Sequence, residues 1–383
     1  MRVMLVTGYY PGARVGGAEY QTSLLAQGLS ARGHEVTFLA AAADQDSVAE
    51  ENGFTIRQIP GWRVNGWSEH RRQTAEVIEE TMPGICYVRA LTELASVSAQ
   101  CRQAGIPVVS ASSSLREVSP FLLGYYPVET IAHLRAGRTL PHFRSFLAIR
   151  SSTAHVCNTI ALRESIRRWY PRKPIQMIYN GQPAPPGDKV HQATTGQIIW
   201  VNNLKRRKRP QLFVELARRL PEYRFLMVGA MPSGGSYAQK LKRMMQDSPD
   251  NLEYLGALPL DEVNELILQS DLLLYTSKAG SEGFGNSFLQ AWHRGVPTVS
   301  LSCELDGILE REGIGCFCEG FDQLVANVRE LMQDEETRLA MGRRAREYAV
   351  RQHTTDRMVS DFEVLFEGAV GGSLATRPVA AVS

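Results

Sequence analysis

Long apolar runs, a strong excess of charge and a cysteine framework are all missing from this sequence. No run of apolar residues approaches the ~18 that a membrane span needs. The short apolar run at residues 2–7 is too brief for a signal peptide and has no cleavage site after it. A formal net charge of only +2 argues against a nucleic-acid partner. We therefore expect a cytoplasmic protein that has at most a peripheral contact with a membrane, at its inner face.

The six cysteines are too few and too scattered over 383 residues to form a disulfide framework, which favours reduced thiols. Cys316 and Cys318 lie close together in GIGCFCEG, but no second pair at metal-binding spacing accompanies them. We interpret both as strand residues. The sequence has no clean motif of an Asp-x-Asp-type metal site and no His/Asp cluster with convincing metal spacing, so we expect neither a metal nor a cofactor.

What the sequence does contain is a regular alternation of short apolar runs and amphipathic segments, typical of parallel, doubly wound sheets. In the first half we predict helices at 17–32, 69–81 and 91–104, and strands at 2–7, 35–41, 54–59, 85–88, 107–110, 153–158 and 174–179. In the second half we predict strands at 197–201, 223–228, 251–255, 271–275 and 296–301, and helices at 211–220, 237–246, 261–269, 285–294, 321–333, 335–352 and 355–368.

A segment rich in proline, glycine and polar residues separates the two halves. We therefore predict an N-terminal domain at 1–183, a linker at 184–196 and a C-terminal domain at 197–354. Residues 371–383 lack apolar periodicity and are expected to be a disordered tail. Ligands of open parallel sheets bind beyond the carboxyl ends of the strands, so two such sheets facing each other predict a functional cleft.

The strongest local signal is TSKAGSEGFGNSFLQAWHRGVPTVSL at 276–301. A predicted strand ends before it, a glycine-rich loop carries Glu282, and a helix begins near Gly285. Free backbone N–H groups at the start of a helix favour anions, phosphates in particular. A carboxylate beside such a site fits the binding of neutral sugar hydroxyls. The alternative is an ordinary connection with a solvated glutamate.

Two further segments follow predicted strands. In GYYPGARVGGAEYQ at 8–21, Gly16 and Gly17 would let a ligand approach the backbone closely, although the segment lacks the dinucleotide-binding pattern and could be a tight turn. In WVNNLKRRKRPQLF at 200–213, a run of basic residues from Lys205 to Arg209 could neutralise a diphosphate, or could form a solvated turn.

Taken together, these segments resemble the retaining glycosyltransferases of family 4, and the resemblance covers residues 1–370. It rests on an ordered set of motifs: GGAE at 16–19, IYNGQP at 178–183, LKRRKRPQLFVELARRLP at 204–221, FLMVG at 225–229, EGFGNSFLQAW at 282–292 and RGVPTVS at 294–300. The resemblance implies the GT-B fold, an α/β architecture of two Rossmann-like doubly wound parallel-sheet domains facing across a cleft. It also implies that the domain at 1–183 is the acceptor side and that the domain at 197–354 binds the nucleotide-sugar donor. A C-terminal helix at 355–370 is expected to pack back on the N-terminal domain.

The resemblance implies a donor site as well. Glu282 matches the family's glutamate that contacts the donor sugar, and Lys208 matches a lysine that faces the pyrophosphate. Gly16 and Gly17 match the N-terminal loop that closes over the phosphates. The diphosphate would be held by the backbone amides of the loop after Glu282, namely those of Gly283, Phe284, Gly285, Asn286 and Ser287.

Three positions depart from the family pattern. Gln290 stands where a second glutamate usually binds the ribose hydroxyls, and its amide can still accept and donate hydrogen bonds. Asn203 stands where an arginine usually faces the pyrophosphate. The family's histidine after the strand at 107–110 is missing from SASSSLREVSP, where Ser112, Ser113, Ser114 or Arg116 takes the space. These changes leave open an altered donor preference or weak activity.

The implied reaction is metal-independent transfer of a hexose from a nucleoside diphosphate sugar, with retention, in polysaccharide, glycolipid or natural-product biosynthesis. Lys208 and the helix start at Gly285 would stabilise charge on the leaving diphosphate. Two alternatives remain, a GT-B-like sugar-nucleotide epimerase and a catalytically weak sugar-nucleotide-binding subunit. The basic segment at 134–173 predicts contact with anionic lipid and a lipid-linked acceptor, unless it is a solvated helix pair. The base and sugar of the donor, the acceptor and the oligomeric state stay open.

Overall fold

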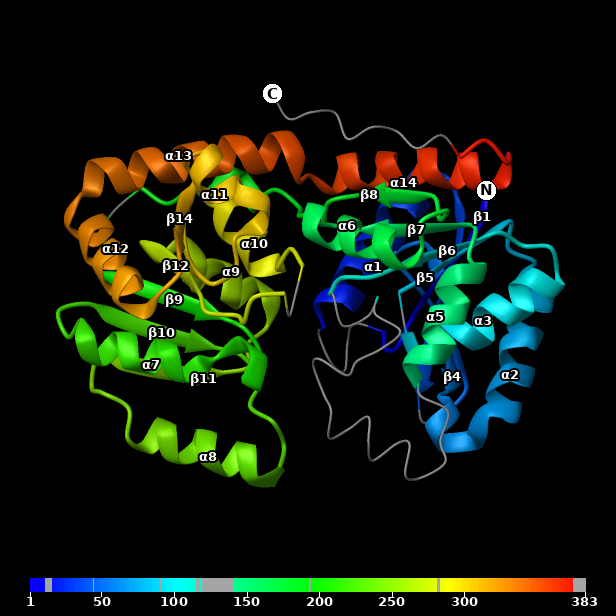
Figure 1. Ribbon diagram of the computed structural model, residues 1–383, viewed down its shortest axis with the longest axis horizontal. Coiled ribbons are helices and arrows are strands. Elements are labelled where there is room, and N and C mark those ends of the chain that lie inside the picture. The colour runs from blue at the N-terminus through cyan, green and yellow to red at the C-terminus, as the bar shows by residue number, and fades with distance from the viewer. Residues whose placement is uncertain are drawn as a thin grey trace. The chain divides into compact units, whose positions relative to one another are not determined.

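The computed structural model describes residues 1–10, 16–43, 45–89, 91–114, 118, 141–192, 194–280 and 283–374. The chain forms two compact units, which Figure 1 colours along the sequence. The N-terminal unit comprises Met1–Gly181 together with Thr355–Ser383, and the C-terminal unit comprises Gln182–Thr354. Each unit is an α/β structure built on one sheet, as the strand–helix alternation predicts.

The sheet of the N-terminal unit has eight strands among the described residues, in the order β3-β4-β2-β1-β5-β6-β7-β8. Its pairings are parallel except that β3 runs antiparallel to β4. The strands are β1 (Arg2–Thr7), β2 (Glu35–Ala43), β3 (Ser47–Glu51), β4 (Phe54–Pro60), β5 (Ile85–Val88), β6 (Val108–Ala111), β7 (Ala154–Cys157) and β8 (Ile175–Met177).

Strand β3 is one of the elements that the sequence pattern did not predict. All five of its residues are exposed, so no apolar alternation marks it. It joins β4 through Asn52 and Gly53, whose φ angles of 51° and 79° are those that an Asn-Gly hairpin turn requires. The turn therefore fixes the pairing of an edge strand that has no buried face.

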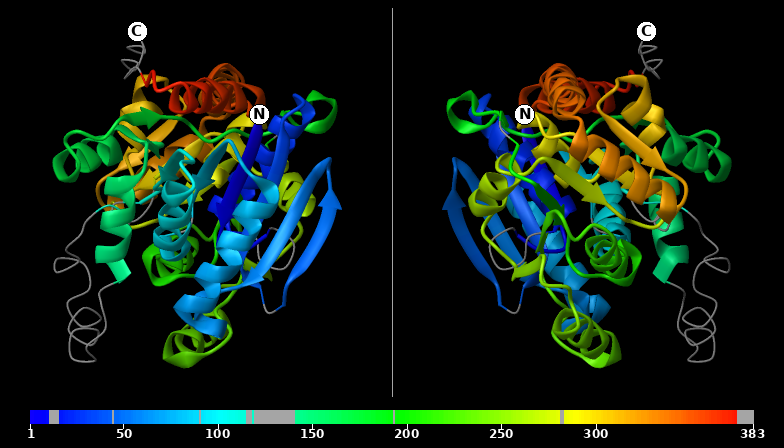
Figure 2. Two further views of the ribbon diagram at one scale, coloured as in Figure 1. Left: turned by 90° about the vertical axis from the view of Figure 1, so that its right-hand side faces the viewer. Right: turned by 90° about the vertical axis from the view of Figure 1, so that its left-hand side faces the viewer.

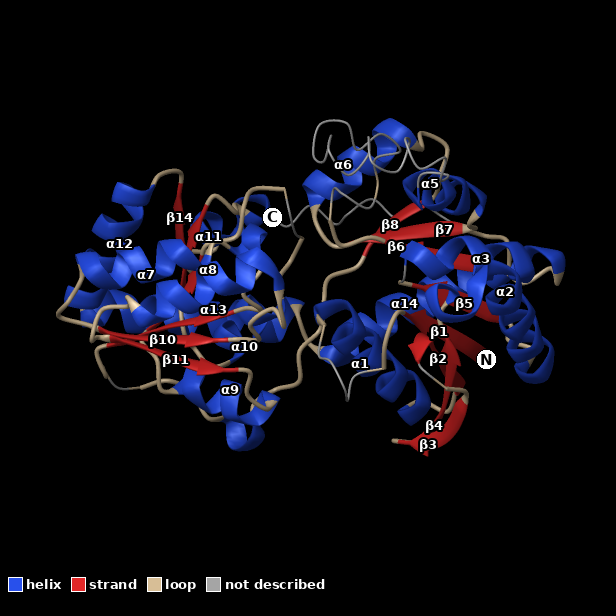
Figure 3. Cartoon of the chain, turned by 90° about the horizontal axis from the view of Figure 1, so that it is seen from below, coloured by secondary structure: helices blue, strands red, loops and turns tan. Residues whose placement is uncertain are grey.

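Helices cover both faces of this sheet (Figure 3). Alternate residues of β1 point to opposite faces, as the strand period of two requires. Val3 and Leu5 join the core cluster of α1 (Gly17–Ala31) and α14 (Thr355–Val370). Met4 and Val6 join the core on the other face. That face is covered by α2 (Trp62–Thr81), α3 (Leu91–Gln103), α5 (Pro141–Ser151) and α6 (Ile160–Trp169).

The C-terminal helix α14 belongs to the N-terminal unit. In both views of Figure 2 the red α14 lies against the blue N-terminal elements. A Cβ built on Gly28 of α1 would lie 2.3 Å from Cγ2 of Val359, so the glycine permits the close approach of the two helices. Arg32 pairs with both Asp356 and Glu363 at the edge of this contact. Residues 375–383 of the predicted tail lie outside the described part of the chain.

The C-terminal unit has a parallel sheet whose six described strands run in the order β11-β10-β9-β12-β13-β14. Its strands are β9 (Gln197–Val201), β10 (Arg224–Val228), β11 (Leu252–Gly256), β12 (Leu272–Tyr275), β13 (Thr298–Leu301) and β14 (Gly315–Cys318). Its helices are α7 (Pro210–Arg219), α8 (Gly235–Gln246), α9 (Leu260–Leu268), α10 (Asn286–His293), α11 (Ile308–Arg311), α12 (Phe321–Gln333) and α13 (Glu335–Gln352). Cys316 and Cys318 are residues of β14 and are not paired in a disulfide, as interpreted above.

Two residues of the segment 184–196, which is predicted to be an interdomain linker, are hydrogen-bonded to Asp271 of the C-terminal unit. His191 is buried, and its Nε2 lies 3.1 Å from the Asp271 carboxylate, while the Thr195 amide donates to the same carboxylate at 3.0 Å. The chain passes between its units at Gly181–Gln182 and again at Thr354–Thr355. Beside these two crossing points, the Gln182 amide donates to the His353 carbonyl at 2.8 Å. The two stretches of chain that connect the units are therefore hydrogen-bonded to each other.

Within the described residues, every helix falls short of the length and apolarity that crossing a lipid bilayer demands.

Candidate functional site

In the C-terminal unit the candidate residues gather at the carboxyl ends of β9 and β12. These two strands are neighbours in the sheet although three strand–helix steps separate them in sequence, because the strand order reverses at β9. Loops that leave a parallel sheet on either side of such a reversal diverge and provide the usual place for a ligand. The loop after β9 carries the basic run at 205–209, and the loop after β12 carries the glycine-rich segment.

The basic run divides into exposed and buried cations. Lys205 and Arg206 are exposed, whereas only 9% of Lys208 is exposed. The Lys208 ammonium donates to the hydroxyl of Tyr275 at 3.2 Å and lies 4.9 Å from the centroid of its ring. A buried ammonium is costly unless such partners hold it. The structure thus singles out Lys208 within the run as a cation fixed at the end of β12.

Arg209 binds backbone carbonyls instead. Nothing in the run of five basic residues distinguishes it from its neighbours. Its Nε donates to the Thr276 carbonyl at 2.6 Å, and its Nη2 donates to the carbonyls of Ser277 and Leu301, both at 3.0 Å. Burial lowers the pKa of this guanidinium, although the side chain stays charged. Arg209 therefore connects the basic loop to the ends of β12 and β13 through hydrogen bonds to their backbone carbonyls.

Thr276 strengthens the same connection. Its hydroxyl accepts from the indole N–H of Trp200 at 2.9 Å and donates to the Lys208 carbonyl at 2.7 Å. Two residues further on, the Lys278 amide donates to the Arg207 carbonyl at 2.8 Å. The backbone of the basic loop is therefore held in register with the beginning of the glycine-rich loop, which places Lys208 reproducibly.

In the glycine-rich loop, Glu282 lies outside the described residues. Gly283 and Phe284 are buried, and Gly285 is the N-cap of α10, with φ −74° and ψ 139°. A Cβ built on Gly285 would lie 2.9 Å from the Tyr275 hydroxyl oxygen, so no larger residue fits there without a shift. Tyr275 thus contacts both Lys208 and the start of α10, whose first two residues are Asn286 and Ser287. No sequence signal marked this tyrosine, because it ends an apolar strand.

The two departures from the family pattern in this unit have defined contacts. Gln290 is buried, and its Nε2 donates to the Asn264 side-chain oxygen at 3.3 Å. Asn203 is exposed, and its side-chain oxygen accepts from the Ala230 amide at 3.1 Å, which braces the loop after β10. Gly229 allows the two loops to approach each other this closely. Its φ is 146°, and a Cβ built on it would lie 1.8 Å from the Asn202 carbonyl oxygen, so only glycine fits at this position.

The remaining candidates belong to the N-terminal unit. Gly16 is the N-cap of α1, and Gly17 is the first residue of that helix. Ser112 is buried just beyond β6, and Ser113 and Ser114 are partly buried, whereas Arg116 lies outside the described residues. Among the described residues, no group of three or more His, Cys, Asp or Glu side chains has the arrangement of a metal site.

Comparison with known proteins covers both units. A family model described as Glycosyltransferase Family 4 matches residues 15–183, and one described as Glycosyl transferases group 1 matches residues 186–348. N-acetyl-alpha-D-glucosaminyl L-malate synthase of Bacillus anthracis is 29% identical over 175 residues, and the match spans 44% of each chain. GDP-mannose-dependent alpha-(1-6)-phosphatidylinositol monomannoside mannosyltransferase of Mycobacterium tuberculosis is 25% identical over 396 residues, 96% of this chain and 98% of that relative.

Among solved structures, Anabaena HepE in complex with UDP-glucose superposes with a TM-score of 0.72 at 16% identity. The match covers 95% of this chain and 99% of the HepE chain. At that level of identity the likeness establishes the fold. The chain therefore spans less than half of the first relative's length and nearly all of the second's, and it shares its fold along almost its entire length with HepE.

Proposed function

This chain belongs to glycosyltransferase family 4 and has the GT-B fold, and we propose on that basis that it transfers a sugar from a nucleoside diphosphate sugar to an acceptor, with retention of anomeric configuration. The proposed reaction needs no metal or cofactor. The proposal draws support from the relatives, one named for its use of GDP-mannose, and from HepE, whose structure holds UDP-glucose. A hexose as the transferred sugar is part of the proposal.

The observation that carries the proposal is the buried Lys208 beside the start of α10. When the bond between sugar and diphosphate breaks, negative charge grows on the leaving diphosphate. A cation that is already positioned stabilises that charge without having to reorganise, which is the largest single contribution in many enzymes. Lys208 meets this requirement, because Tyr275, Thr276 and the backbone of the glycine-rich loop hold it in place.

The other donor residues take proposed roles around this cation. Glu282 would bind hydroxyl groups of the donor sugar, and the amides of Gly285 and Asn286 would bind the diphosphate at the helix start. Gln290 would bind the ribose through the amide that it shares with Asn264. Asn203 would donate its amide N–H to the diphosphate, since its oxygen is already used by the Ala230 amide.

The first test is a thermal-shift screen of the purified protein against UDP-, GDP-, ADP- and dTDP-sugars, because a ligand that binds only the folded state raises the melting temperature. With the identified donor and an acceptor, Glu282→Ala is expected to lower turnover by roughly 100-fold or more. The exposed Glu304→Ala serves as a matched control and should leave turnover within about twofold. Undiminished turnover of Glu282→Ala would remove its proposed role.

Product analysis separates this proposal from its alternatives. An α-configured product from an α-configured donor, followed by NMR, is the expected result and agrees with retention. Conversion of the donor to its epimer without any acceptor would favour the epimerase. Donor binding without turnover on any acceptor would favour a binding subunit, the alternative that Gln290, Asn203 and the missing histidine of the N-terminal half suggest.

We also propose that the acceptor is lipid-linked and that the basic segment 134–173 contacts anionic lipid from the cytoplasmic side, in the synthesis of a polysaccharide, glycolipid or glycosylated natural product. Arg167, Arg168 and Arg172 are exposed, which supports the proposal. The Lys173 ammonium instead donates to the Arg150 carbonyl at 2.8 Å and is directed toward the protein. Residues 134–140 lie outside the described part.

Sedimentation with phosphatidylglycerol vesicles tests this contact. The wild type is expected to bind, and neutralising Arg167, Arg168 and Arg172 together should weaken binding by roughly 100-fold, at about 1 kcal/mol for each charge. Neutralising the exposed Arg218, Arg224 and Arg243 of the C-terminal unit is the control and should have little effect. A wild type that stays in the supernatant would contradict the contact.

A further inference from the structure

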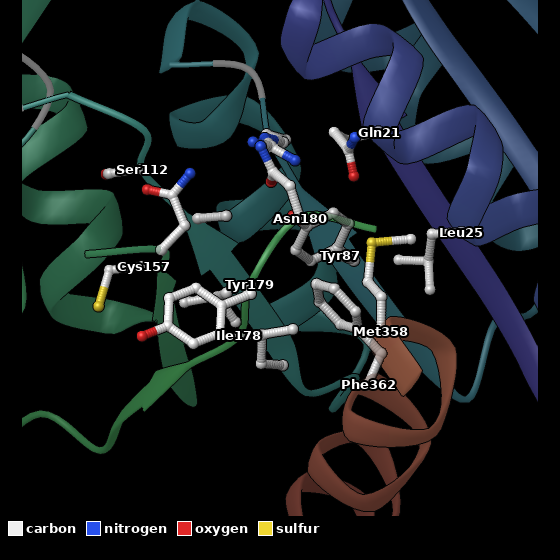
Figure 4. A pocket seen from close by; sticks show the side chains of 14 residues that line it. Gln21, Leu25, Tyr87, Ser112, Cys157, Ile178, Tyr179, Asn180, Met358 and Phe362 are labelled. Atoms are coloured by element: carbon white, nitrogen blue, oxygen red, sulfur yellow. The ribbon is translucent and has the colours of Figure 1, made fainter. Parts of the chain in front are cut away.

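In each unit an arginine lies at the carboxyl ends of the strands. In the N-terminal unit, Arg89 directly follows β5 and lines a pocket together with Ser112 and Asn158 (Figure 4). That pocket lies in the unit that the family resemblance assigns to the acceptor. In the C-terminal unit, Arg209 ends the basic run, and its guanidinium lies at the ends of β12 and β13. It is the neighbour in sequence of Lys208, the cation of the proposed donor site.

The positive charge of Arg209 meets only neutral groups within the described part of the chain. Its Nε donates to the Thr276 carbonyl at 2.6 Å, and its Nη2 donates to the carbonyls of Ser277 and Leu301 at 3.0 Å. Burial lowers the pKa of the guanidinium, as happens when no anion compensates for lost hydration. A partly buried cation without a carboxylate partner favours the binding of an anion from outside.

Two other arginines of this chain show the more usual arrangement. The buried Arg338 lies 3.7 Å from the Asp271 carboxylate, and Arg32 forms an ion pair with Asp356. In both places the protein itself supplies the anion. At Arg209 the described residues supply three carbonyl oxygens in its stead, which satisfy hydrogen bonds but leave the charge in place.

The backbone of Arg209 is held in a left-handed conformation, with φ 50° and ψ 53°. A residue with a Cβ adopts this conformation only at a cost, and glycine is the usual residue there. Three more left-handed residues other than glycine lie in the loop directly after β13, namely Ser302, Leu305 and Asp306. Strained positions gather at ligand sites more than elsewhere. Through its bond to the Leu301 carbonyl, Arg209 joins the two strained loops.

Arg209 also fixes the position of Lys208. The Thr276 carbonyl accepts from Arg209, and the Thr276 hydroxyl donates to the Lys208 carbonyl at 2.7 Å. One residue at the end of β12 therefore holds both cations, one through its main chain and one through its side chain. The Lys208 ammonium in turn donates to the Tyr275 hydroxyl at 3.2 Å. A shift of Arg209 is thus transmitted to Lys208.

The charges at this place restrict the anion that suits it. Carbonyl oxygens at the ends of the strands present negative potential to an anion, and the Arg209 guanidinium offsets three of them. Lys208 alone would suffice for an anion with a single charge. A diphosphate carries more than one negative charge and gains from a second cation nearby.

We propose that Arg209 is the second cation of the donor site and that it makes the site selective for a diphosphate over a monophosphate. It acts by holding Lys208 in place and by adding a charge that no carboxylate of the described residues neutralises. Because its nitrogens bind the strand carbonyls and it acts through Lys208 and through its charge, Arg209 is a positioning residue. This inference rests on the proposed transferase function, whose donor is a nucleoside diphosphate sugar.

Calorimetry on the full chain tests the proposal with inorganic pyrophosphate and inorganic phosphate as probes. The wild type is expected to bind pyrophosphate roughly tenfold or more tightly than phosphate. Arg209→Met keeps the stem and removes the charge, so pyrophosphate affinity should fall about tenfold while phosphate affinity changes little. Arg209→Lys keeps the charge and should retain pyrophosphate affinity within about threefold. Arg218→Met, which removes an exposed arginine of α7, is the control and should change neither affinity.

Turnover with the donor from the thermal-shift screen separates charge from position. Arg209→Lys is expected to keep KM within about threefold and to lower kcat about tenfold, because a lysine lacks the forked donors that bind three carbonyls. Arg209→Met should raise KM and lower kcat. Asn203→Arg added to Arg209→Met returns a charge to the exposed end of β9 and should recover pyrophosphate affinity but not kcat. A purely structural role would give equal losses in both single variants and no recovery.

Several outcomes would overturn the inference while leaving the transferase in place. These are a wild type that turns over a donor but binds pyrophosphate no more tightly than phosphate, unchanged pyrophosphate affinity in Arg209→Met, and equal losses in Arg209→Met and Arg209→Lys. A wild type that binds neither pyrophosphate nor any nucleotide sugar of the screen would remove the proposed function and the inference together. If Arg209→Met does not fold, Arg209→Gly takes its place with the same expected loss, because glycine relieves the left-handed backbone.

Discussion

Replacement of Lys208 by alanine is expected to lower turnover by about 100- to 1,000-fold, the usual loss when one preorganised group that stabilises developing charge is removed. The loss follows from the position of the ammonium, which is buried and donates to the Tyr275 hydroxyl at 3.2 Å. Steady-state kinetics with the identified donor measure the effect, and calorimetry measures the accompanying loss of donor affinity. The melting temperature should change little, because removal of a buried cation relieves its desolvation cost.

Two further variants make the Lys208 prediction specific. Lys205→Ala removes an exposed cation from the same loop and should leave turnover within about threefold. Tyr275→Phe keeps the ring beneath the ammonium and removes only the hydroxyl, so its effect should be intermediate. Equal losses in Lys205→Ala and Lys208→Ala would show that the run acts through its overall charge. Unchanged donor affinity and turnover in Lys208→Ala would end its role at the diphosphate.

Replacement of Asp271 by alanine is expected to destabilise the C-terminal unit by about 3–5 kcal/mol. Neither Asp271 nor Arg338 is exposed to solvent, and their charged groups lie 3.7 Å apart. The carboxylate also accepts from the amides of Thr195 and Gln197. Without it, the buried Arg338 charge keeps only neutral acceptors, and two backbone donors lose the carboxylate that accepts from them. Thermal unfolding measures the effect, and a fall in melting temperature of about 10 °C is expected for a unit of this size.

The Asp271 prediction has a matched control and a rescue. Asp322→Ala removes an exposed carboxylate 3.5 Å from Arg219, and no measurable change is expected. Arg338→Met combined with Asp271→Ala should recover part of the loss, because the uncompensated buried charge is then gone. Failure of the double variant to recover any stability would show that the backbone bonds, and not the ion pair, carry the effect.

The pH dependence of this contribution follows from the pKa of Asp271. Burial on its own would raise that pKa, but the hydrogen bond from His191, the charge of Arg338 and the amide of Thr195 together lower it below its ordinary value of 3.8. A carboxyl whose pKa is lowered by folding contributes its stability at every pH above the unfolded value. The difference between wild type and Asp271→Ala should therefore be the same at pH 6 and pH 8 and diminish below about pH 4.

Some of the strands and helices were predictable to the residue. The strands β5 and β9 and the helices α12 and α13 have the bounds that their sequence patterns indicate. Strand β3 was not predictable, because its pairing depends on a hairpin turn and none of its residues is buried. The contacts of the segment 184–196 could not be predicted from its polar composition, because the Asp271 carboxylate that Thr195 binds lies far along the chain, just before β12.

The candidate site was likewise predictable only in part. The order of motifs led to the family and the fold, because each motif is local. The resemblance already selects Lys208 within five consecutive basic residues, but its burial against Tyr275 and Thr276 depends on the pairing of β9 with β12. The pocket could not be predicted at all, since Arg89, Ser112 and Asn158 come from the ends of three strands that the sheet order makes neighbours.

Helix α14 has a consequence for how this protein is made. A ribosome releases the N-terminal unit first, but α14 supplies Met358, Phe362 and Phe366 to the core of that unit. All of Gln182–Thr354 must be synthesised in between, which takes on the order of ten seconds or more at ordinary elongation rates. During that interval the nascent chain carries an uncovered apolar face beside β1 and α1. The unit whose synthesis begins first is thus the last to be completed. If translation stops before residue 355, the C-terminal unit of the resulting chain can fold, but its N-terminal unit lacks α14 and leaves part of its core exposed.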